Sequence, residues 1–324
     1  MSTQNILPRD VFVNQIYEEA LKNKDLYFLS ADFGAQALDK FRDQLPHQFI
    51  HAGISEQNMV DIAAGLALNG KLAYIYAMIP FVTFRCYEQV KVALATMNLP
   101  VTVVGVGSGY SYDDAGPTHY ATEDISCMRA LGNIEILSPG DTQSTFEAAK
   151  LTFTKPAFRY IRLDRKFLPD IYQKGETRFL KDGICEIDKG EEICIITTGY
   201  MVQKVRQAKE ILLKEGIQIG VIDLFRLKPI QGTLLSSIVS RYKGVMTVEE
   251  QFLSGGLGSA ITEVLADERI LLPVKRVGIN DHYYLDNGGR EYLHKLCKID
   301  VQSIVEKIKQ FHASLAGNRV LSSK

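Results

Sequence analysis

The chain has 324 residues, which is enough for about two domains of average size. Its hydrophobic fraction of 46% and charged fraction of 23% are ordinary for a soluble globular protein. A formal net charge of -1 offers no basic stripe, so we do not expect nucleic acid as a partner. No apolar run is long enough to cross a membrane, and the N-terminus lacks the layout of a signal peptide. Five cysteines without a Cys-x-x-Cys pair favour reduced thiols in a cytoplasmic protein.

The first half of the chain alternates short apolar runs with amphipathic stretches, which predicts a parallel sheet covered by helices. The expected strands are residues 26–30, 72–79, 101–106, 134–137 and 157–162. The expected helices are residues 11–22, 55–69, 80–98 and a stretch that begins at about Asp141. A glycine-rich loop, residues 107–120, follows the third strand. Ligands of such sheets usually bind at the carboxyl ends of the strands, so we look for chemistry there.

From residue 166 to about residue 189 the periodicity fades and charges accumulate, which we interpret as a connection to a second domain. A second alternating series follows, with strands at 193–197, 217–224, 245–248 and 274–279 and helices at 202–214, 233–241 and 258–266. The expected fold class is therefore α/β, with two tandem three-layer domains of mostly parallel sheet. We place the first domain at residues 1–170, a linker at 171–190 and the second domain at 191–324.

Three features of the first half contain side chains that could take part in catalysis or ligand binding. Glu56 lies just inside an expected helix start, where a carboxylate can also simply compensate the helix dipole. Phe81, Phe84 and Tyr87 recur every third residue, an arrangement found in cores as well as in pockets. The glycine-rich loop ends in His119, and a lone histidine is usually structural. Each feature alone has an ordinary explanation, but their order along the chain is specific.

These features resemble a known family. Gly-Ile-Ser-Glu-Gln-Asn at 53–58, Phe-x-x-Phe-x-x-Tyr at 81–87 and Gly-Pro-Thr-His at 116–119 look like the pyrimidine-binding domain of transketolases. They are also close to the same domain of 1-deoxy-D-xylulose-5-phosphate synthases. Residues 247–259, Thr-Val-Glu-Glu-Gln-Phe-Leu-Ser-Gly-Gly-Leu-Gly-Ser, are similar to the signature of the transketolase C-terminal domain. The resemblance extends over nearly the whole chain and implies thiamine diphosphate as the cofactor.

The resemblance also implies a role for individual residues. Glu56 matches the glutamate that hydrogen-bonds N1′ of the aminopyrimidine and so favours the imino tautomer, whose N4′ takes the proton from the thiazolium C2. Asp32 matches an aspartate close to the cofactor. His119 matches the histidine beside the reacting carbonyl, where it would donate a proton and stabilise the alkoxide. The residues that match the rings lining the pyrimidine pocket are Phe81, Phe84 and Tyr87.

Arginines are expected to hold the phosphate of the substrate, because guanidinium groups suit phosphate oxygens. The resemblance points to Arg9 and to Arg165, with Arg162 as the fallback for the second position. The chain departs from the family at three positions where family members contact the substrate. In this sequence those positions are Gly107, Ala115 and Gln36. The donor and acceptor therefore need not be the common pentose and hexose phosphates.

One family motif is missing. Transketolases hold the diphosphate through Mg²⁺ with a Gly-Asp-Gly segment, and this sequence contains none. Mg²⁺ prefers carboxylate and carbonyl oxygens around phosphates, and the chain offers no recognisable set, so we expect no metal ligands in it. The resemblance then implies a separate N-terminal, diphosphate-binding subunit, with the active site at the interface and a heterotetramer of two such pairs.

The expected function is that of a transferase subunit, which with its partner moves a two-carbon ketol unit between sugar phosphates. Two alternatives stay open. The chain could belong to a 1-deoxy-D-xylulose-5-phosphate synthase-like enzyme, or be the beta-type subunit of a 2-oxo-acid dehydrogenase, acting on pyruvate or another 2-oxo acid. It could also be a non-catalytic scaffold that has kept the fold.

Overall fold

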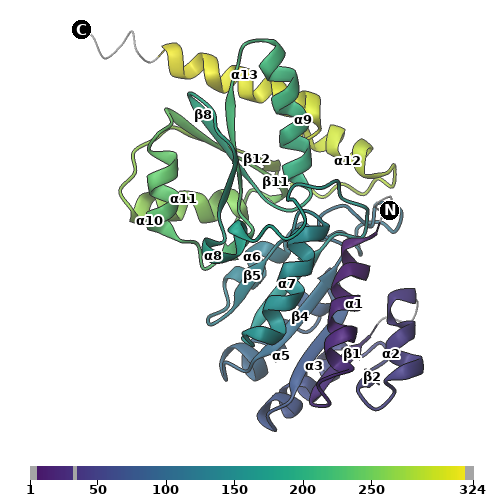
Figure 1. The fold of residues 1–324 in the computed structure, drawn as a ribbon. Helices are drawn as coiled ribbons and strands as arrows, with labels where there is room; N and C mark the ends of the chain where they lie inside the picture. Colours follow the sequence, from purple (N-terminus) through teal and green to yellow (C-terminus); the bar gives the residue numbers. More distant parts are fainter. Residues whose placement is uncertain (1–5, 32–34, 318–324) are drawn as a thin grey trace.

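The computed structural model describes residues 6–31 and 35–317. It contains two sheets of seven and five strands, each mostly parallel and covered by helices on both faces (Figure 1). The α/β fold class expected from the sequence, with two three-layer units, is therefore confirmed. Within these residues, no helix is both long enough and apolar enough to cross a bilayer.

The larger sheet has the strand order β10-β5-β6-β4-β3-β1-β2. Its strands are β1 (Leu26–Ser30), β2 (Phe49–His51), β3 (Leu72–Met78), β4 (Val101–Val106), β5 (Glu135–Leu137), β6 (Arg159–Leu163) and β10 (Arg226–Lys228). Every residue of β4 is buried, as the apolar run predicts for a strand covered on both faces. All neighbouring strands in this sheet are parallel except β10, which pairs antiparallel with β5.

Two helical layers cover the larger sheet, and alternate residues of β3 show both of them. Ile75 packs in the same cluster as α3, whereas Tyr74 faces α1 and α7 and shares a 2.9 Å hydrogen bond with Thr152. This is the period of two expected of a strand. The helices are α1 (Pro8–Ala20), α2 (Asp39–Gln44), α3 (Glu56–Leu68), α4 (Ile79–Thr83), α5 (Tyr87–Gln89), α6 (Asp124–Arg129) and α7 (Thr142–Thr154).

The smaller sheet has the order β12-β11-β8-β9-β7. Its strands are β7 (Cys185–Asp188), β8 (Ile193–Thr197), β9 (Ile219–Asp223), β11 (Gly244–Phe252) and β12 (Val274–Ile279). The helices of this half are α8 (Arg178–Asp182), α9 (Met201–Lys214), α10 (Gly232–Val239), α11 (Leu257–Asp267), α12 (Arg290–Cys297) and α13 (Val301–Gly317). Helices α9 and α13 cover one face and α10 and α11 the other (Figure 1). The cluster under α10 and α11 continues into the one under α3, so the two units share a core.

Three expectations need correction. The stretch 80–98 is not one helix: α4 ends at Thr83, α5 is short, and a π-helix (Val90–Ala95) follows. The expected linker contains α8 and β7, and β7 pairs antiparallel with β9 inside the smaller sheet. The strand β10 lies in the second half of the sequence but completes the sheet of the first. β7 and β10 are only four and three residues long and contain charged residues, so they lack the apolar run that marks the predicted strands.

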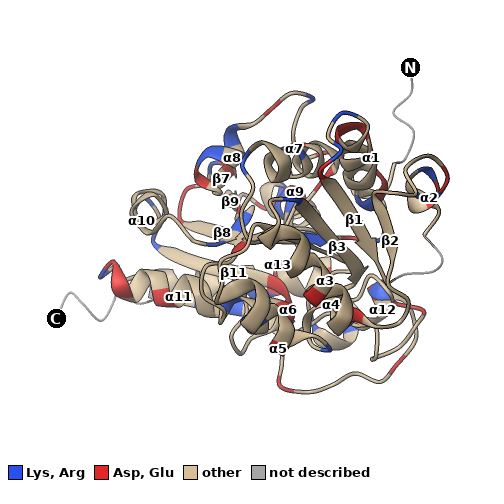
Figure 2. Cartoon of the chain, turned by 90° about the horizontal axis from the view of Figure 1, so that it is seen from below, with Lys and Arg blue, Asp and Glu red and all other residues tan. Residues whose placement is uncertain are grey.

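Charged side chains are mixed over the molecule. In Figure 2, Lys and Arg alternate with Asp and Glu along the drawn elements, and helices such as α2 carry both signs. The mixture of signs in this view agrees with the near-zero net charge.

Candidate active site

Glu56 lies at the first position of α3, where it is only 2% exposed. One terminal nitrogen of Arg85 donates to both of its carboxylate oxygens, at 2.9 Å each. The guanidinium carbon of Arg85 also lies 4.1 Å from the centre of the Phe81 ring, which is cation–π geometry. The helix N-terminus and this cation together compensate a carboxylate that is otherwise removed from water.

His119 lies at the end of the glycine-rich loop and meets two aromatic rings. Its ring centre is 5.3 Å from that of Phe81, edge to face, and 5.7 Å from that of Tyr112. Its Nδ1 and the hydroxyl of Thr118 are 2.9 Å apart. Burial and the neighbouring Arg165 cation lower the pKa of His119, so its imidazole is mainly neutral at neutral pH. Phe81 thus lies between the Arg85–Glu56 pair and this histidine.

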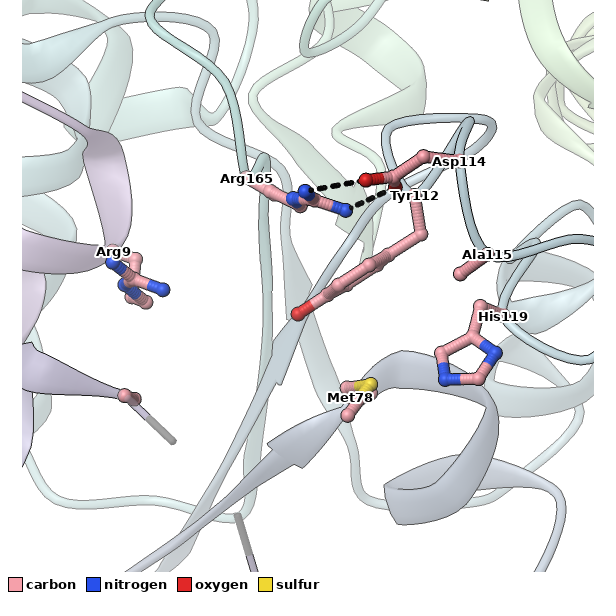
Figure 3. Close-up of a pocket in the computed structure, with 8 residues that line it drawn as sticks. Arg9, Met78, Tyr112, Asp114, Ala115, His119 and Arg165 are labelled. Atoms are coloured by element: carbon pink, nitrogen blue, oxygen red, sulfur yellow. Dashed lines mark hydrogen bonds and ion pairs between the residues drawn. The ribbon is translucent and has the colours of Figure 1, made fainter. Parts of the chain in front are cut away.

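A cavity of about 380 Å³ opens beside His119 (Figure 3). Its lining comes from α1, the end of β3, the glycine-rich loop and the segment after β6: Arg9, Ala35, Met78, Tyr112, Asp114, Ala115, His119 and Arg165. Arg9 faces this space from one side and Arg165 from another, with His119 beyond Met78 (Figure 3). Two guanidinium groups around one cavity suit an anionic ligand.

Arg165 is held in place by two neighbours. Its terminal nitrogens donate to the two carboxylate oxygens of Asp114 at 2.6 and 3.2 Å, and its guanidinium carbon lies 4.5 Å from the centre of the Tyr112 ring. Arg162, the fallback, is elsewhere: its side chain is 5% exposed and donates to the buried Asp124 at 2.5 and 3.1 Å. The structure corrects the fallback, because Arg162 faces the interior and Arg165 faces the cavity.

The three rings do not form one stripe, because α4 ends between them. Phe81 contacts both His119 and Arg85, whereas the hydroxyl of Tyr87 donates to the backbone carbonyl of Cys127 at 2.9 Å and Phe84 is 36% exposed. Asp32 lies outside the described residues. The sequence reasoning missed Arg85, although a basic residue directly after Phe84 in an aromatic, apolar segment was a signal that could have identified it.

The second unit holds the loop that carries His119. Hydrogen bonds across this boundary include those from Gln251 to the carbonyl of Ala121 (2.7 Å), from the Arg290 backbone to Asp113 (2.8 Å), from Asn287 to the carbonyl of Asp114 (3.2 Å) and from Tyr120 to the carbonyl of Asp286 (2.7 Å). The position of the cavity therefore depends on both halves of the chain.

Behind the loop lies a buried ionic network centred on Arg290. Its guanidinium donates to Asp164 of the first unit at 2.9 Å and to Glu250 of the second at 2.8 and 2.5 Å, and it stacks 3.5 Å from the Tyr200 ring centre. Burial alone would raise the pKa of Glu250, but Arg290 and His294 outweigh it and hold that pKa well below its ordinary range. These charges tie the two units together. Among the described residues, no three His, Cys, Asp or Glu side chains are grouped to hold a metal ion.

Comparison with known proteins identifies the family of the chain. Residues 5–170 match the family "Transketolase, pyrimidine binding domain" and residues 183–304 match "Transketolase, C-terminal domain". The chain therefore belongs to the transketolase family, as the sequence motifs indicated.

Particular relatives narrow the comparison. The chain is 32% identical to a subunit of the apulose-4-phosphate transketolase of Phocaeicola vulgatus, over 90% of this chain and 93% of that protein. It is 34% identical to 1-deoxy-D-xylulose-5-phosphate synthase of Caldanaerobacter subterraneus subsp. tengcongensis, covering 95% of this chain but only 49% of that protein. A solved structure described as a split gene transketolase, inactive beta4 tetramer, superposes with a TM-score of 0.83 at 28% identity, over 94% of this chain and 97% of that one.

Proposed function

We propose that this chain is the pyrimidine-binding subunit of a two-chain, thiamine diphosphate-dependent transketolase that moves a two-carbon ketol unit between sugar phosphates. One observation carries the proposal: a buried carboxylate at a helix start, Glu56, lies across the Phe81 ring from a cavity that holds a histidine and two arginines. A hydrogen-bond partner for a ring nitrogen (Glu56), a stacking surface (Phe81) and a site for an anion (the cavity) therefore lie next to one another.

The residues fit the aminopyrimidine end of the cofactor. A flat, nitrogen-rich cation, the guanidinium of Arg85, already bonds to Glu56 over the face of Phe81. An aminopyrimidine ring is also flat and offers nitrogens to a carboxylate, so the same two groups can receive it. When bound, thiamine diphosphate supplies the nucleophilic carbon that the protein lacks. Glu56 would hold a proton at the pyrimidine nitrogen, and Phe81 would stack on the ring.

The cavity would receive the sugar phosphate. His119, mainly neutral at neutral pH, would move a proton to or from the oxygen of the reacting carbonyl, which is general acid–base work. Arg9 and Arg165 would bind the phosphate, since a phosphate can replace Asp114 as the acceptor of the Arg165 donors. Asp32, expected near the cofactor, remains part of the proposal.

A second polypeptide would complete the site. Apolar residues in the same two segments of the chain as Glu56 and Arg85 are exposed, including Ile54 at 77%, Phe84 at 36% and Val92 at 56%. A partner chain that covers them would bring the diphosphate and Mg²⁺ ligands, and two such pairs would form a heterotetramer. Relatives that are named as one subunit of a transketolase support this two-chain arrangement. Five free cysteines support a cytoplasmic location.

The test is reconstitution. The chain is purified with a partner that contains a Gly-Asp-Gly diphosphate domain, and thiamine diphosphate and Mg²⁺ are added. We expect ketol transfer between sugar phosphates without release of CO₂. Release of CO₂ from pyruvate would instead support the synthase alternative. The observation that favours this alternative is the 34% identity to a 1-deoxy-D-xylulose-5-phosphate synthase. If the two chains together do not bind the cofactor, the remaining hypothesis is a non-catalytic scaffold protein that has kept the fold.

Glu56→Gln gives the residue-level test. The amide keeps the size of the side chain but removes the carboxylate that the pyrimidine nitrogen needs, so we expect kcat to fall at least about 100-fold. Glu210→Gln is the matched control, because Glu210 is an exposed carboxylate on α9, and it should retain normal activity. Near-normal turnover of Glu56→Gln would remove the assignment.

A further inference from the structure

Arg85 contacts both of the groups that are assigned to the pyrimidine. It binds both oxygens of Glu56 through a single nitrogen and lies over the same Phe81 ring on which the aminopyrimidine would stack. Both oxygens of the carboxylate therefore accept from Arg85, and one face of the Phe81 ring lies under its guanidinium. An aminopyrimidine that stacked on this face and bonded to Glu56 would occupy the space of the guanidinium, so Arg85 has to move before it can bind.

We propose that Arg85 is an internal occupant of the pyrimidine subsite, which it fills in the cofactor-free chain and leaves when the cofactor binds. This inference rests on the proposed function, because it takes Glu56 and Phe81 as the receivers of the aminopyrimidine. The guanidinium resembles the ligand in three respects that matter here: it is flat, it donates hydrogen bonds from nitrogen, and its face can stack on a ring.

The exposure of the side chains supports displacement. The Arg85 side chain is 37% exposed while that of Glu56 is 3% exposed, so the cation can move to water and the carboxylate cannot. Two other arginines also bind buried carboxylates: Arg162 within the first unit and Arg290 at the boundary between the units. Their side chains are only 5% and 3% exposed, so neither guanidinium can move into water. Arg85 is thus built as a removable partner, whereas the other two are fixed.

The placement has a physical reason. A buried carboxylate without a partner is strongly unfavourable, and Glu56 would be in that state whenever the site lacked its cofactor. Arg85 satisfies the charge until the pyrimidine arrives, but it also competes with the pyrimidine. The apparent dissociation constant of the cofactor is then higher than the intrinsic one, because the subsite is open in only a fraction of the chains.

The experiment measures cofactor affinity rather than activity. Thiamine diphosphate is titrated with Mg²⁺ into the reconstituted two-chain complex by calorimetry, for the wild type and for Arg85→Met. We expect the dissociation constant to fall, by roughly three- to tenfold, because the competitor is gone. Loss of a positive charge would by itself weaken binding of an anionic cofactor, so tighter binding cannot arise from bulk electrostatics. An unchanged or higher dissociation constant would overturn the proposal.

Arg241→Met is the matched control. Arg241 also binds both oxygens of a glutamate, Glu186, through one nitrogen at 2.9 Å each, and is 48% exposed, but Glu186 lies on β7 of the second unit and is not assigned to the pyrimidine. Its removal should leave the dissociation constant unchanged. If Arg85→Met does not assemble with its partner, Arg85→Gln, which is neutral and still polar, is titrated in its place with the same expectation. A wild-type complex that binds no cofactor would count against the proposed function itself, which is a separate outcome.

Discussion

Two groups of ion pairs in this molecule use the same chemistry in different surroundings. At the boundary between the units, Arg290, Asp164 and Glu250 are each no more than 7% exposed. At the cavity and across the Phe81 ring from it, the Arg165–Asp114 and Arg85–Glu56 pairs include arginine side chains that are 31% and 37% exposed. The buried group fixes the positions of the two units, because a charge removed from water must keep its partner. The open group can exchange its partner for a ligand, because water compensates the change.

The largest effect should come from breaking the buried group. Arg290→Met leaves Asp164 and Glu250 buried without their guanidinium, and we expect the free energy of unfolding to fall by about 3–5 kcal/mol. Urea unfolding followed by circular dichroism measures this. Arg241→Met, at an exposed pair, should change the same quantity by less than about 1 kcal/mol. Equal effects of the two variants would contradict the distinction between the groups.

A buried carboxyl without a cation should have an intermediate effect that depends on pH. Burial raises the pKa of Asp223 to about 7, although the Tyr172 hydroxyl donates to it at 2.7 Å. In the unfolded chain this group loses its proton near its ordinary pKa of 3.8, so the folded state holds the proton to higher pH. The free energy of unfolding should therefore fall as pH rises from about 4 to about 7.

Asp223→Asn tests this by removing the titration. The variant should lose part of that fall and be more stable than the wild type at pH 8, by on the order of 2 kcal/mol. Urea unfolding of both proteins at pH 5 and pH 8 gives the comparison. Some pH dependence of the same sign should remain, because burial raises the pKa of Glu249 to about 7 as well. A variant with the same pH profile as the wild type would refute the role of Asp223.

The smallest effect on stability should come from the open group. Arg165→Met removes an exposed pair, so we expect the free energy of unfolding to change by less than about 1 kcal/mol. Its effect on function should be larger: the KM for the sugar phosphate should rise about tenfold, since one guanidinium–phosphate contact is lost. Steady-state kinetics of the reconstituted complex measures this. A large loss of stability with an unchanged KM would place Arg165 with the buried group instead.

Much of the fold could be predicted from the sequence. The strands at 26–30, 193–197 and 274–279 have the expected bounds, because apolar runs between turn residues are a local signal. The helix expected from about Asp141 begins at Thr142, with Asp141 as its cap: the Asp141 carboxylate accepts from the Ser144 backbone at 2.8 Å. The prediction of one helix at 80–98 was wrong, because hydrophobic periodicity does not reveal the turn at Phe84 to Cys86 or the π-helix after it.

The candidate site residues could be named from the sequence, but the pairs that they form could not. Motif order pointed to Glu56, Phe81 and His119, and the structure places His119 at the cavity and Phe81 between it and Glu56. The choice between Arg162 and Arg165 could not be made from sequence, because they are only three positions apart and only their relation to the end of β6 distinguishes them. Arg162 lies within the strand and faces the interior, while Arg165 follows it and reaches the cavity.

The sequence by itself determined the α/β class and the family and named the candidate site residues, because local periodicity and short motifs are visible in it directly. Only the tertiary structure decided which charges meet. Arg85 and Glu56 are 29 residues apart in the chain, Arg165 and Asp114 are 51 apart, and Arg290 and Asp164 are 126 apart. Whether such a pair is permanent or displaceable depends on how much water reaches it, and water access is a property of the folded molecule alone.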